Sequence, residues 1–427
     1  MGLGHFFRSG PGRGLIGQGF TLFSVMGVQL LQVPTYLNVL TAEEYGAYLV
    51  LIAVPSALTL ADFGLLSALS TRLTRLIAAG KQPEATQVFR MVLYIVFFLT
   101  SMILVAVFSI LAFFVIELEP FNRIEAAAVL SQYTVYSLLF ILSSALEGAM
   151  RASNAYADAW MRLAFMRISD FACGVALLYL TDSVIFAVSG MLISRMIGVA
   201  QLYRRTRMRA TWASFSPLRP TRSGMEGMMK PTIGSAALPI GNAVLNQGVV
   251  LAVNASLGPA AVAVYSTTRT IVSTLRQLSN VVSNGILPHM TQRYALSRAL
   301  EAQSFLRRVF FATSAVLLAS SVVLALCGQW LVSIWTLGRI EPSQSLLLIM
   351  ICQVLIESIW TLIAVQLLAQ NIHFGYSIFY AIAAIATVTV LYMLPPNIIE
   401  GFPLVTLAQS ALMLIFVSYR TRKTLRL

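Results

Sequence analysis

The chain has 427 residues, of which 58% are hydrophobic and only 11% are charged, and its mean hydropathy is +0.80. Soluble domains average roughly 45–50% apolar and about 25% charged residues, so this composition excludes a soluble globular protein and indicates one embedded in a lipid bilayer. The formal net charge of +13 does not indicate nucleic-acid binding, because the basic residues are distributed over the gaps between apolar segments and form no soluble basic face.

Twelve apolar segments follow one another along the chain. A helix of about 18–26 such residues, rising about 1.5 Å per residue, is long enough to cross a hydrocarbon core of roughly 30 Å. The expected spans are 14–38, 46–69, 89–116, 126–149, 163–181, 184–203, 232–256, 261–286, 309–336, 344–368, 374–394 and 401–419.

The basic residues crowd into every second gap between these spans. Of the 29 lysines and arginines, 24 lie at the termini, in the even-numbered loops or in the span ends that border them, and only Arg123 and Arg339 lie in the other loops. Loops rich in lysine and arginine stay on the cytoplasmic side of a membrane. The sequence therefore predicts a multi-pass protein with both termini in the cytoplasm.

The longest basic connection, 203–231, separates six spans from six. An offset of 217 residues aligns identical residues of the two parts, among them Gly17 with Gly234, Tyr48 with Tyr265 and Arg90 with Arg307. We therefore expect an N-terminal six-helix half (1–210), a cytoplasmic linker (211–231) and a C-terminal six-helix half (232–427). Repeats with an even number of spans are related by an axis along the membrane normal. The expected fold is all-α, a polytopic membrane protein with 12 transmembrane helices in two six-helix bundles around a central cavity.

Polar residues inside the spans are candidates for a binding site. The first span of each half carries an internal proline and several amides, and Gln29 and Asn246 are equivalent under the offset of 217. Buried amides either join helices by hydrogen bonds or line a path for a hydroxyl-rich substrate. The sequence leaves both readings open.

Seven ionisable residues lie within spans: Asp62, Glu147, Asp170, Arg195, Arg269, Arg276 and Glu357. A charge in hydrocarbon is costly, so each should face protein or water. Glu147 and Asp170 lie near cytoplasmic ends, where we expect them to pair with Arg151 and Arg167, one helical turn away.

Arg269 and Arg276 are the strongest candidates for ligand binding. Seven residues are nearly two helical turns, so both side chains project from one face, about 10 Å apart along the axis. A guanidinium matches two phosphate oxygens at once, which favours an anionic ligand. The alternative is an ion pair with Asp62 or Glu357, and the two roles do not exclude each other.

The motifs of common enzymes are missing from the sequence. It contains no GxxxxGK[ST], HExxH or GxSxG pattern, so we expect neither direct use of ATP, nor catalysis, nor a metal or other cofactor. The cysteines Cys173, Cys327 and Cys352 fall inside spans without a pairing pattern. We expect them to be small core residues.

The segment 40–80 (LTAEEYGAYLVLIAVPSALTLADFGLLSALSTRLTRLIAAG) resembles the start of the polysaccharide flippases, which handle O-antigen and exopolysaccharide units, in the multidrug, oligosaccharidyl-lipid and polysaccharide (MOP) superfamily. In that family an external turn leads into YGxY, and the next helix carries DFGL or DLGL before a basic end. The matching positions are Tyr45, Gly46 and Tyr48, then Asp62, Phe63, Gly64 and Leu65, then Arg72 and Arg75. Twelve spans in two halves fit the family along the whole chain.

The resemblance implies a transporter that moves oligosaccharide repeat units linked to undecaprenyl pyrophosphate across the bacterial plasma (inner) membrane by alternating access. Its product would feed lipopolysaccharide O-antigen or exopolysaccharide synthesis, and polysaccharide assembly proteins would be partners alongside membrane lipid. The expected substrate-binding residues are Arg269, Arg276, Arg195, Gln29 and Asn246. Asp62 and Glu357 would bind a coupling cation, H⁺ or Na⁺, or form ion pairs.

The chain departs from the related lipid II flippases, which usually carry two further helices and an arginine motif in the first span that is not visible in 14–38. Surface polysaccharide is therefore favoured over peptidoglycan precursor. A cation-coupled multidrug antiporter of the same superfamily is the first alternative, although its cavity should be dominated by carboxylates. A non-transporting scaffold of a polysaccharide assembly complex is the second.

Overall fold

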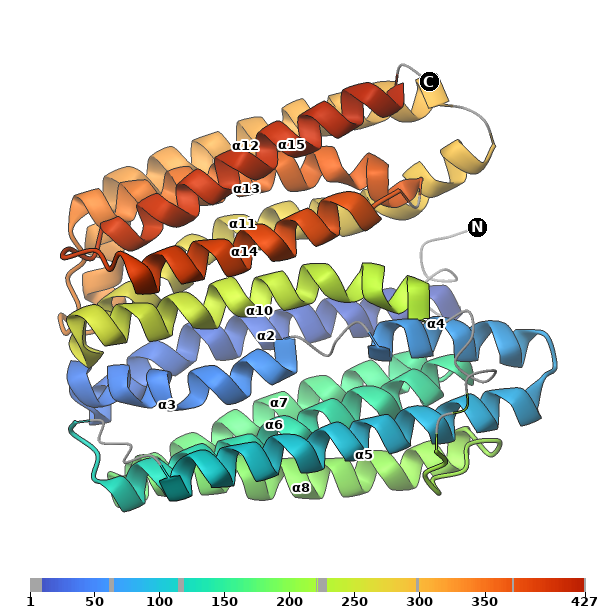
Figure 1. The fold of residues 1–427 in the computed structure, drawn as a ribbon, viewed down its shortest axis with the longest axis horizontal. Coiled ribbons are helices and arrows are strands. Elements are labelled where there is room, and N and C mark those ends of the chain that lie inside the picture. The colour runs from blue at the N-terminus through green and yellow to red at the C-terminus, as the bar shows by residue number, and fades with distance from the viewer. Residues whose placement is uncertain are drawn as a thin grey trace. The chain divides into compact units, whose positions relative to one another are not determined.

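The computed structural model describes residues 10–60, 65–113, 119–219, 221, 229–296, 299–370 and 372–425. These residues form thirteen helices (Figure 1). The first seven are α2 (Gly10–Val39), α3 (Ala42–Leu60), α4 (Leu65–Ala78), α5 (Gln82–Phe113), α6 (Arg123–Ala152), α7 (Tyr156–Thr181) and α8 (Val184–Arg209). The other six are α10 (Met229–Leu257), α11 (Pro259–Ala295), α12 (Ala299–Trp335), α13 (Gln344–Ala369), α14 (Phe374–Met393) and α15 (Gly401–Leu425).

Where the structure describes them, eleven of the twelve predicted spans each fall on a single helix to within one residue, and the expected all-α polytopic fold is confirmed. The second predicted span, 46–69, falls on two helices, α3 and α4. Residues 61–64 between them, which include Asp62, lie outside the described residues. Eight helices of the described part are long and apolar enough to cross a membrane: α6, α7, α8, α10, α12, α13, α14 and α15.

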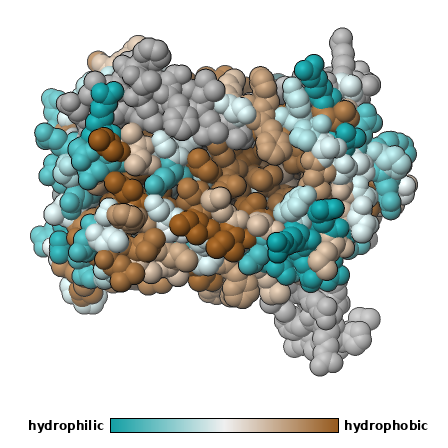
Figure 2. Space-filling model, turned by 90° about the horizontal axis from the view of Figure 1, so that it is seen from below, coloured by the Kyte–Doolittle hydropathy of each residue, from teal (hydrophilic) through white to brown (hydrophobic). Residues whose placement is uncertain are grey.

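The outer surface has the character of a lipid-facing one. Large apolar side chains are exposed along the helices, including Phe23, Leu180 and Leu326, the last with 81% of its surface accessible. On the face drawn in Figure 2, hydrophobic residues fill the middle and hydrophilic residues gather toward the two ends. The three cysteines are also exposed, so the expectation that they belong to the core was wrong. A span has a lipid-facing side as well as a core side, and its composition does not distinguish them.

The offset of 217 residues recurs in the positions of the helix ends. Adding 217 to the first residue of α3 and the last residue of α4 gives 259–295, the bounds of α11. The same shift takes α8 to 401–426, where α15 spans Gly401–Leu425, and the first residue of α5 to 299, the first of α12. Helix ends are set by local caps and by the surrounding medium, so this agreement supports an internal repeat.

The chain forms two compact units. The first consists of Met1–Leu40 and Leu51–Ala243, and the second of Thr41–Val50 and Val244–Leu427. The first ten residues from Thr41 therefore belong with the second unit, although α3 continues into the first. The division of the chain into halves at 211–231 stays a prediction.

The start of α3 is fixed by its own sequence and by its neighbour. Thr41 and Glu44 form a capping box: the Thr41 main-chain N–H donates to Glu44 Oε2 at 2.8 Å, and the Glu44 N–H donates to Thr41 Oγ1 at 3.2 Å. One turn later, Gly46 packs against the first turn of α11 within the second unit. A Cβ on Gly46 would overlap the carbonyl group of Pro259 and lie 3.3 Å from the Ala263 nitrogen.

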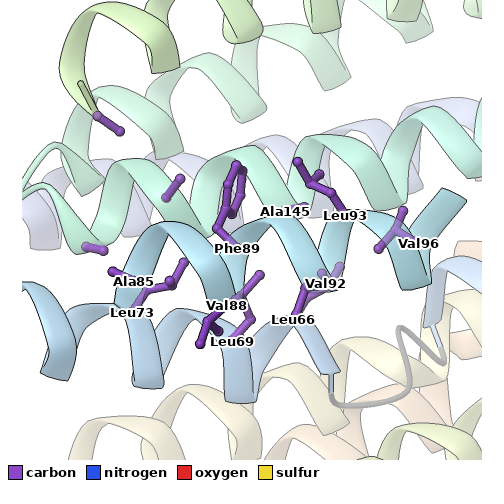
Figure 3. Packing of buried hydrophobic residues seen from close by; sticks show 13 residues of the cluster. Leu66, Leu69, Leu73, Ala85, Val88, Phe89, Val92, Leu93, Val96 and Ala145 are labelled. Carbon is purple, nitrogen blue, oxygen red and sulfur yellow. The ribbon is translucent and has the colours of Figure 1, made fainter. Parts of the chain in front are cut away.

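The core of the first unit includes a cluster between α4, α5 and α6 (Figure 3). Leu66, Leu69 and Leu73 recur on one face of α4 and pack with Val88 and Phe89 of α5. The chain beyond α8 packs against this cluster.

Two aromatic residues hold that connecting segment in place. These residues are Trp212 and Phe215. Their ring centroids lie 6.0 and 5.6 Å, respectively, from the ring centroid of Phe89. The Trp212 indole N–H donates to Ser153 Oγ at 2.9 Å, and Thr86 Oγ1 donates to the Trp212 carbonyl at 2.6 Å. The beginning of the predicted linker is therefore tied to α5 and α6.

Candidate functional site

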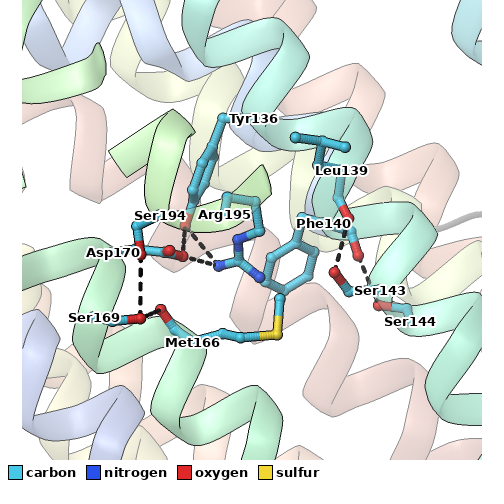
Figure 4. Close-up of polar contacts among 10 residues, drawn as sticks. All are labelled: Tyr136, Leu139, Phe140, Ser143, Ser144, Met166, Ser169, Asp170, Ser194 and Arg195. Carbon is cyan, nitrogen blue, oxygen red and sulfur yellow. Dashed lines mark hydrogen bonds and ion pairs between the residues drawn. The ribbon is translucent and has the colours of Figure 1, made fainter. Parts of the chain in front are cut away.

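Arg195 is buried in the first unit, within a cluster formed by α6, α7 and α8 (Figure 4). Its Nη2 donates to Tyr136 Oη at 2.8 Å and forms an ion pair with Asp170 Oδ2. The Tyr136 hydroxyl donates to the same carboxylate oxygen at 3.1 Å. The guanidinium lies 4.9 Å from the Tyr136 ring centroid and 5.2 Å from that of Phe140. With both charged side chains only 2% exposed, this cluster joins three helices in the interior.

The ion-pair partner predicted for Asp170 was wrong. Asp170 pairs with Arg195 of α8, whereas the Arg167 guanidinium lies over the Phe140 ring at 6.0 Å. Asp170 pairs with Arg195 rather than Arg167 because α7 and α8 pack closely together. A Cβ on Gly190 of α8 would lie only 2.6 Å from the Cys173 carbonyl of α7, and small residues let membrane helices approach to such distances.

The other predicted pair of this group, Glu147 with Arg151, is confirmed. The Arg151 Nη2 donates to Glu147 Oε1 at 2.8 Å and the Nε donates to the same oxygen at 3.0 Å. The two residues are one turn apart on α6, where a carboxylate four residues before an arginine favours pairing.

Arg269 and Asn246 are brought together in the second unit. Arg269 projects from α11, and its Nη1 donates to the main-chain carbonyl of Asn246 on α10 at 2.7 Å. Its guanidinium also lies 5.5 Å from the ring centroid of Tyr265, one turn earlier on the same helix. A guanidinium has five N–H donors, and the hydrogen bond to the Asn246 carbonyl uses one of them.

Arg276 lies two turns further along α11 and faces Glu357 of α13. Its Nη1 is 3.5 Å from Glu357 Oε1, and the two side chains are 30% and 12% exposed. The Tyr380 hydroxyl of α14 interacts electrostatically with both Glu357 and Arg276. The ion pair that the sequence offered as an alternative for Arg276 is therefore present.

The charges within the spans do not follow the offset of 217 residues, although the helix ends do. At the offset of 217, Glu357 corresponds to Phe140, whose ring lies against the Arg195 guanidinium in the first unit. Arg269 corresponds to Ile52 and Arg276 to Thr59. The charges of Arg269 and Arg276 on α11 and of Glu357 on α13 therefore have no charged counterpart at this offset.

The remaining predicted site residues are not gathered with these arginines in the described part. Gln29 is exposed on α2 in the first unit, and Asp62 lies outside the described residues. Sequence reasoning missed Tyr136 and Tyr380, whose aromatic rings are common in membrane helices and gave no signal. Over the part of the chain that the structure describes, no cluster of three or more His, Cys, Asp or Glu could hold a metal ion.

No family model and no curated protein matches the chain. Solved structures do match its fold. An inward-facing multidrug resistance MATE family transporter of the MOP superfamily aligns with a TM-score of 0.72 at 12% identity, covering 96% of this chain and 98% of that one. The lipid II flippase MurJ, in an inward closed conformation, aligns with a TM-score of 0.71 at 13% identity, covering 96% and 87%.

A third match is a MOP superfamily transporter from Pyrococcus furiosus described as having a binding pocket of reverse polarity. It has a TM-score of 0.56 and 12% identity, and covers 96% of this chain and 93% of that one. The chain therefore has the fold of this class of multi-helix membrane transporters.

Proposed function

We propose that the chain is a flippase for oligosaccharide repeat units linked to undecaprenyl pyrophosphate, acting by alternating access in the bacterial plasma membrane. Arg269 and Arg276 would bind the diphosphate, and the observation that carries this proposal is their position on α11. This helix of 37 residues is rich in serine and threonine and carries two part-buried arginines. Such a composition suits a face toward water or a polar ligand better than one toward lipid.

The fold alone does not decide the charge of the substrate. One match is named as a multidrug transporter, another as a lipid II flippase, and a third is described by the reverse polarity of its pocket. The charges of this chain's own residues must therefore decide. Once Glu147 and Asp170, near the ends of their spans, are set apart, three arginines stand against the two carboxylates Asp62 and Glu357, which favours an anion. Arg195 has its partners inside the first unit, which leaves the pair on α11 as our assignment for the head group.

Replacement of Arg269 or Arg276 by alanine is expected to weaken binding of undecaprenyl pyrophosphate roughly 10- to 150-fold, because each charged hydrogen bond contributes about 1.5–3 kcal/mol. Lysine should restore only part of the affinity, since an ammonium does not contact two phosphate oxygens in a fork. Binding to the purified protein in detergent measures this. Surface polysaccharide, in a strain that depends on this chain, should fall in parallel.

Unchanged binding and export by the Arg269→Ala/Arg276→Ala double variant, at normal expression, would contradict the proposal. Ethidium serves as the cationic comparison. The multidrug alternative is favoured by the carboxylate of Glu357, which lies inside a span. It would replace the flippase proposal if the wild type binds ethidium, fails to bind undecaprenyl pyrophosphate, and loses ethidium binding on Glu357→Gln.

The proposed orientation places both termini and the even-numbered loops in the cytoplasm. Six helices would end on that side, and five of them, α4, α6, α8, α11 and α15, carry basic residues in the last turn, whereas α13 carries none. Cysteine at Glu43 or Glu341, in a background without the native cysteines, should react in intact cells with a membrane-impermeant maleimide. Cysteine at Arg207 should react only after permeabilisation, and the reverse pattern would overturn the orientation.

A further inference from the structure

The Arg276–Glu357 pair differs from the other ion pairs of the described residues. Its N–O distance of 3.5 Å is the longest among them. Like every pair of the described residues except Arg195–Asp170, it also keeps some accessible surface on both side chains. The Arg195–Asp170 pair is closed off in the interior and braced by Tyr136. A long, partly accessible ion pair is held weakly, because water screens it and its hydrogen-bond geometry is poor. Another anion can therefore replace the Glu357 carboxylate at Arg276 with little loss of free energy.

Arg276 is also one of the two residues to which we assign the substrate diphosphate, so its carboxylate partner competes with the ligand. A carboxylate brings one negative charge to the guanidinium. A phosphodiester lipid head group also brings one, whereas a pyrophosphate brings more charge and two phosphate groups. Guanidinium forks bind phosphate in bidentate fashion, so a pyrophosphate is the stronger competitor.

We infer that Glu357 is a specificity-determining residue, a displaceable counter-ion that keeps single-charge phosphodiester lipids off Arg276 and yields to a diphosphate. The inference rests on the proposed function. A flippase for a rare lipid-linked substrate works in a membrane made largely of phospholipid, so its cationic site needs a means of rejecting ordinary anionic head groups. Specificity of this kind requires a repulsive element as well as an attractive one, and Glu357 supplies it.

The Glu357→Gln variant tests this, since glutamine keeps the size of the side chain and removes its charge. Binding of phosphatidylglycerol and of undecaprenyl pyrophosphate is measured on the purified full chain. Wild type should prefer the diphosphate strongly. The variant should bind phosphatidylglycerol on the order of tenfold more tightly than wild type, so its preference for the diphosphate should be smaller. Glu357→Asp, which keeps the charge, should keep most of the wild-type preference.

Asp158→Asn is the matched control for a general change in charge. Asp158 pairs with Arg162 at 3.0 Å and with Arg205 at 2.9 Å, all within the first unit, whereas Glu357 belongs to the second. Asp158→Asn should leave binding of both lipids unchanged. Adding Arg276→Ala to Glu357→Gln should remove the gain in phosphatidylglycerol binding, because the gain acts through that guanidinium. Thermal melting and size-exclusion profiles establish that each variant is folded.

The outcomes separate the two proposals. Wild type that binds undecaprenyl pyrophosphate selectively, with Glu357→Gln showing the same selectivity, overturns the role of Glu357 and leaves the flippase proposal standing. Equal gains for Glu357→Gln and Asp158→Asn also overturn it, because general electrostatics would then explain both. Wild type that binds no undecaprenyl pyrophosphate overturns the proposed function itself.

Discussion

Asp170→Asn is expected to lower the free energy of unfolding by about 3–5 kcal/mol, because removing one partner of a buried ion pair leaves the other charge uncompensated. Asparagine has nearly the same shape as aspartate, so packing changes little and the loss reports the charge. Arg195, only 1% exposed, would keep its contact with Tyr136 and lose its counter-ion. Unfolding of the purified protein in mixed micelles with increasing dodecyl sulfate measures the effect.

Asp158→Asn is the matched control here too, since the Asp158 side chain is 26% exposed and its arginine partners are about one-third exposed. Exposed pairs contribute about 0–1 kcal/mol, so this variant should unfold close to wild type. The double variant Asp170→Leu/Arg195→Met, which removes both charges, should recover much of the lost stability. An Asp170→Asn loss no larger than that of the control would show that the cluster does not hold α6, α7 and α8 together.

The fold could be predicted from the sequence because a bilayer imposes strict rules. Each span must satisfy its main-chain hydrogen bonds within a helix, so twelve apolar segments gave twelve helical regions. Their lengths were underestimated: the predicted 261–286 became Pro259–Ala295, and 309–336 began at Ala299. Hydropathy registers only the part of a helix in contact with hydrocarbon, and these helices continue into regions rich in charge, around Arg293 and Arg307.

The candidate site could be predicted only in part. Seven ionisable residues stood out in the spans because charge there is costly, and the Glu147–Arg151 pair followed from spacing on one helix. The Asp170–Arg195 pair joins residues 25 positions apart, and spacing does not state which face of α8 meets α7. Glycines such as Gly190 indicate that another helix packs closely, but they do not indicate which helix it is. The contact of Arg269 with a main-chain carbonyl has no signature in side-chain sequence at all.

Gly46→Ala is expected to lower the free energy of unfolding by about 3 kcal/mol or more. Overpacking usually costs about 1–3 kcal/mol when neighbouring side chains can yield. Here the added Cβ would meet the main-chain carbonyl of Pro259 at the start of α11, and that group moves only if the helix moves. The glycine of the YGxY motif is therefore required by the space between two helix starts, and its conformation is ordinary helix.

Gly285→Ala provides the control, because Gly285 lies within α11 and a Cβ there meets nothing within 4 Å. Alanine is a better helix former than glycine by about 1 kcal/mol, so this variant should be unchanged or slightly more stable. Thermal melting of both variants beside wild type gives the comparison directly. Since Ala263 is the equivalent of Gly46 at the offset of 217, corresponding positions of α3 and α11 lie beside each other at this contact within the second unit. Equal melting temperatures for Gly46→Ala and Gly285→Ala would mean that α3 and α11 do not approach each other this closely.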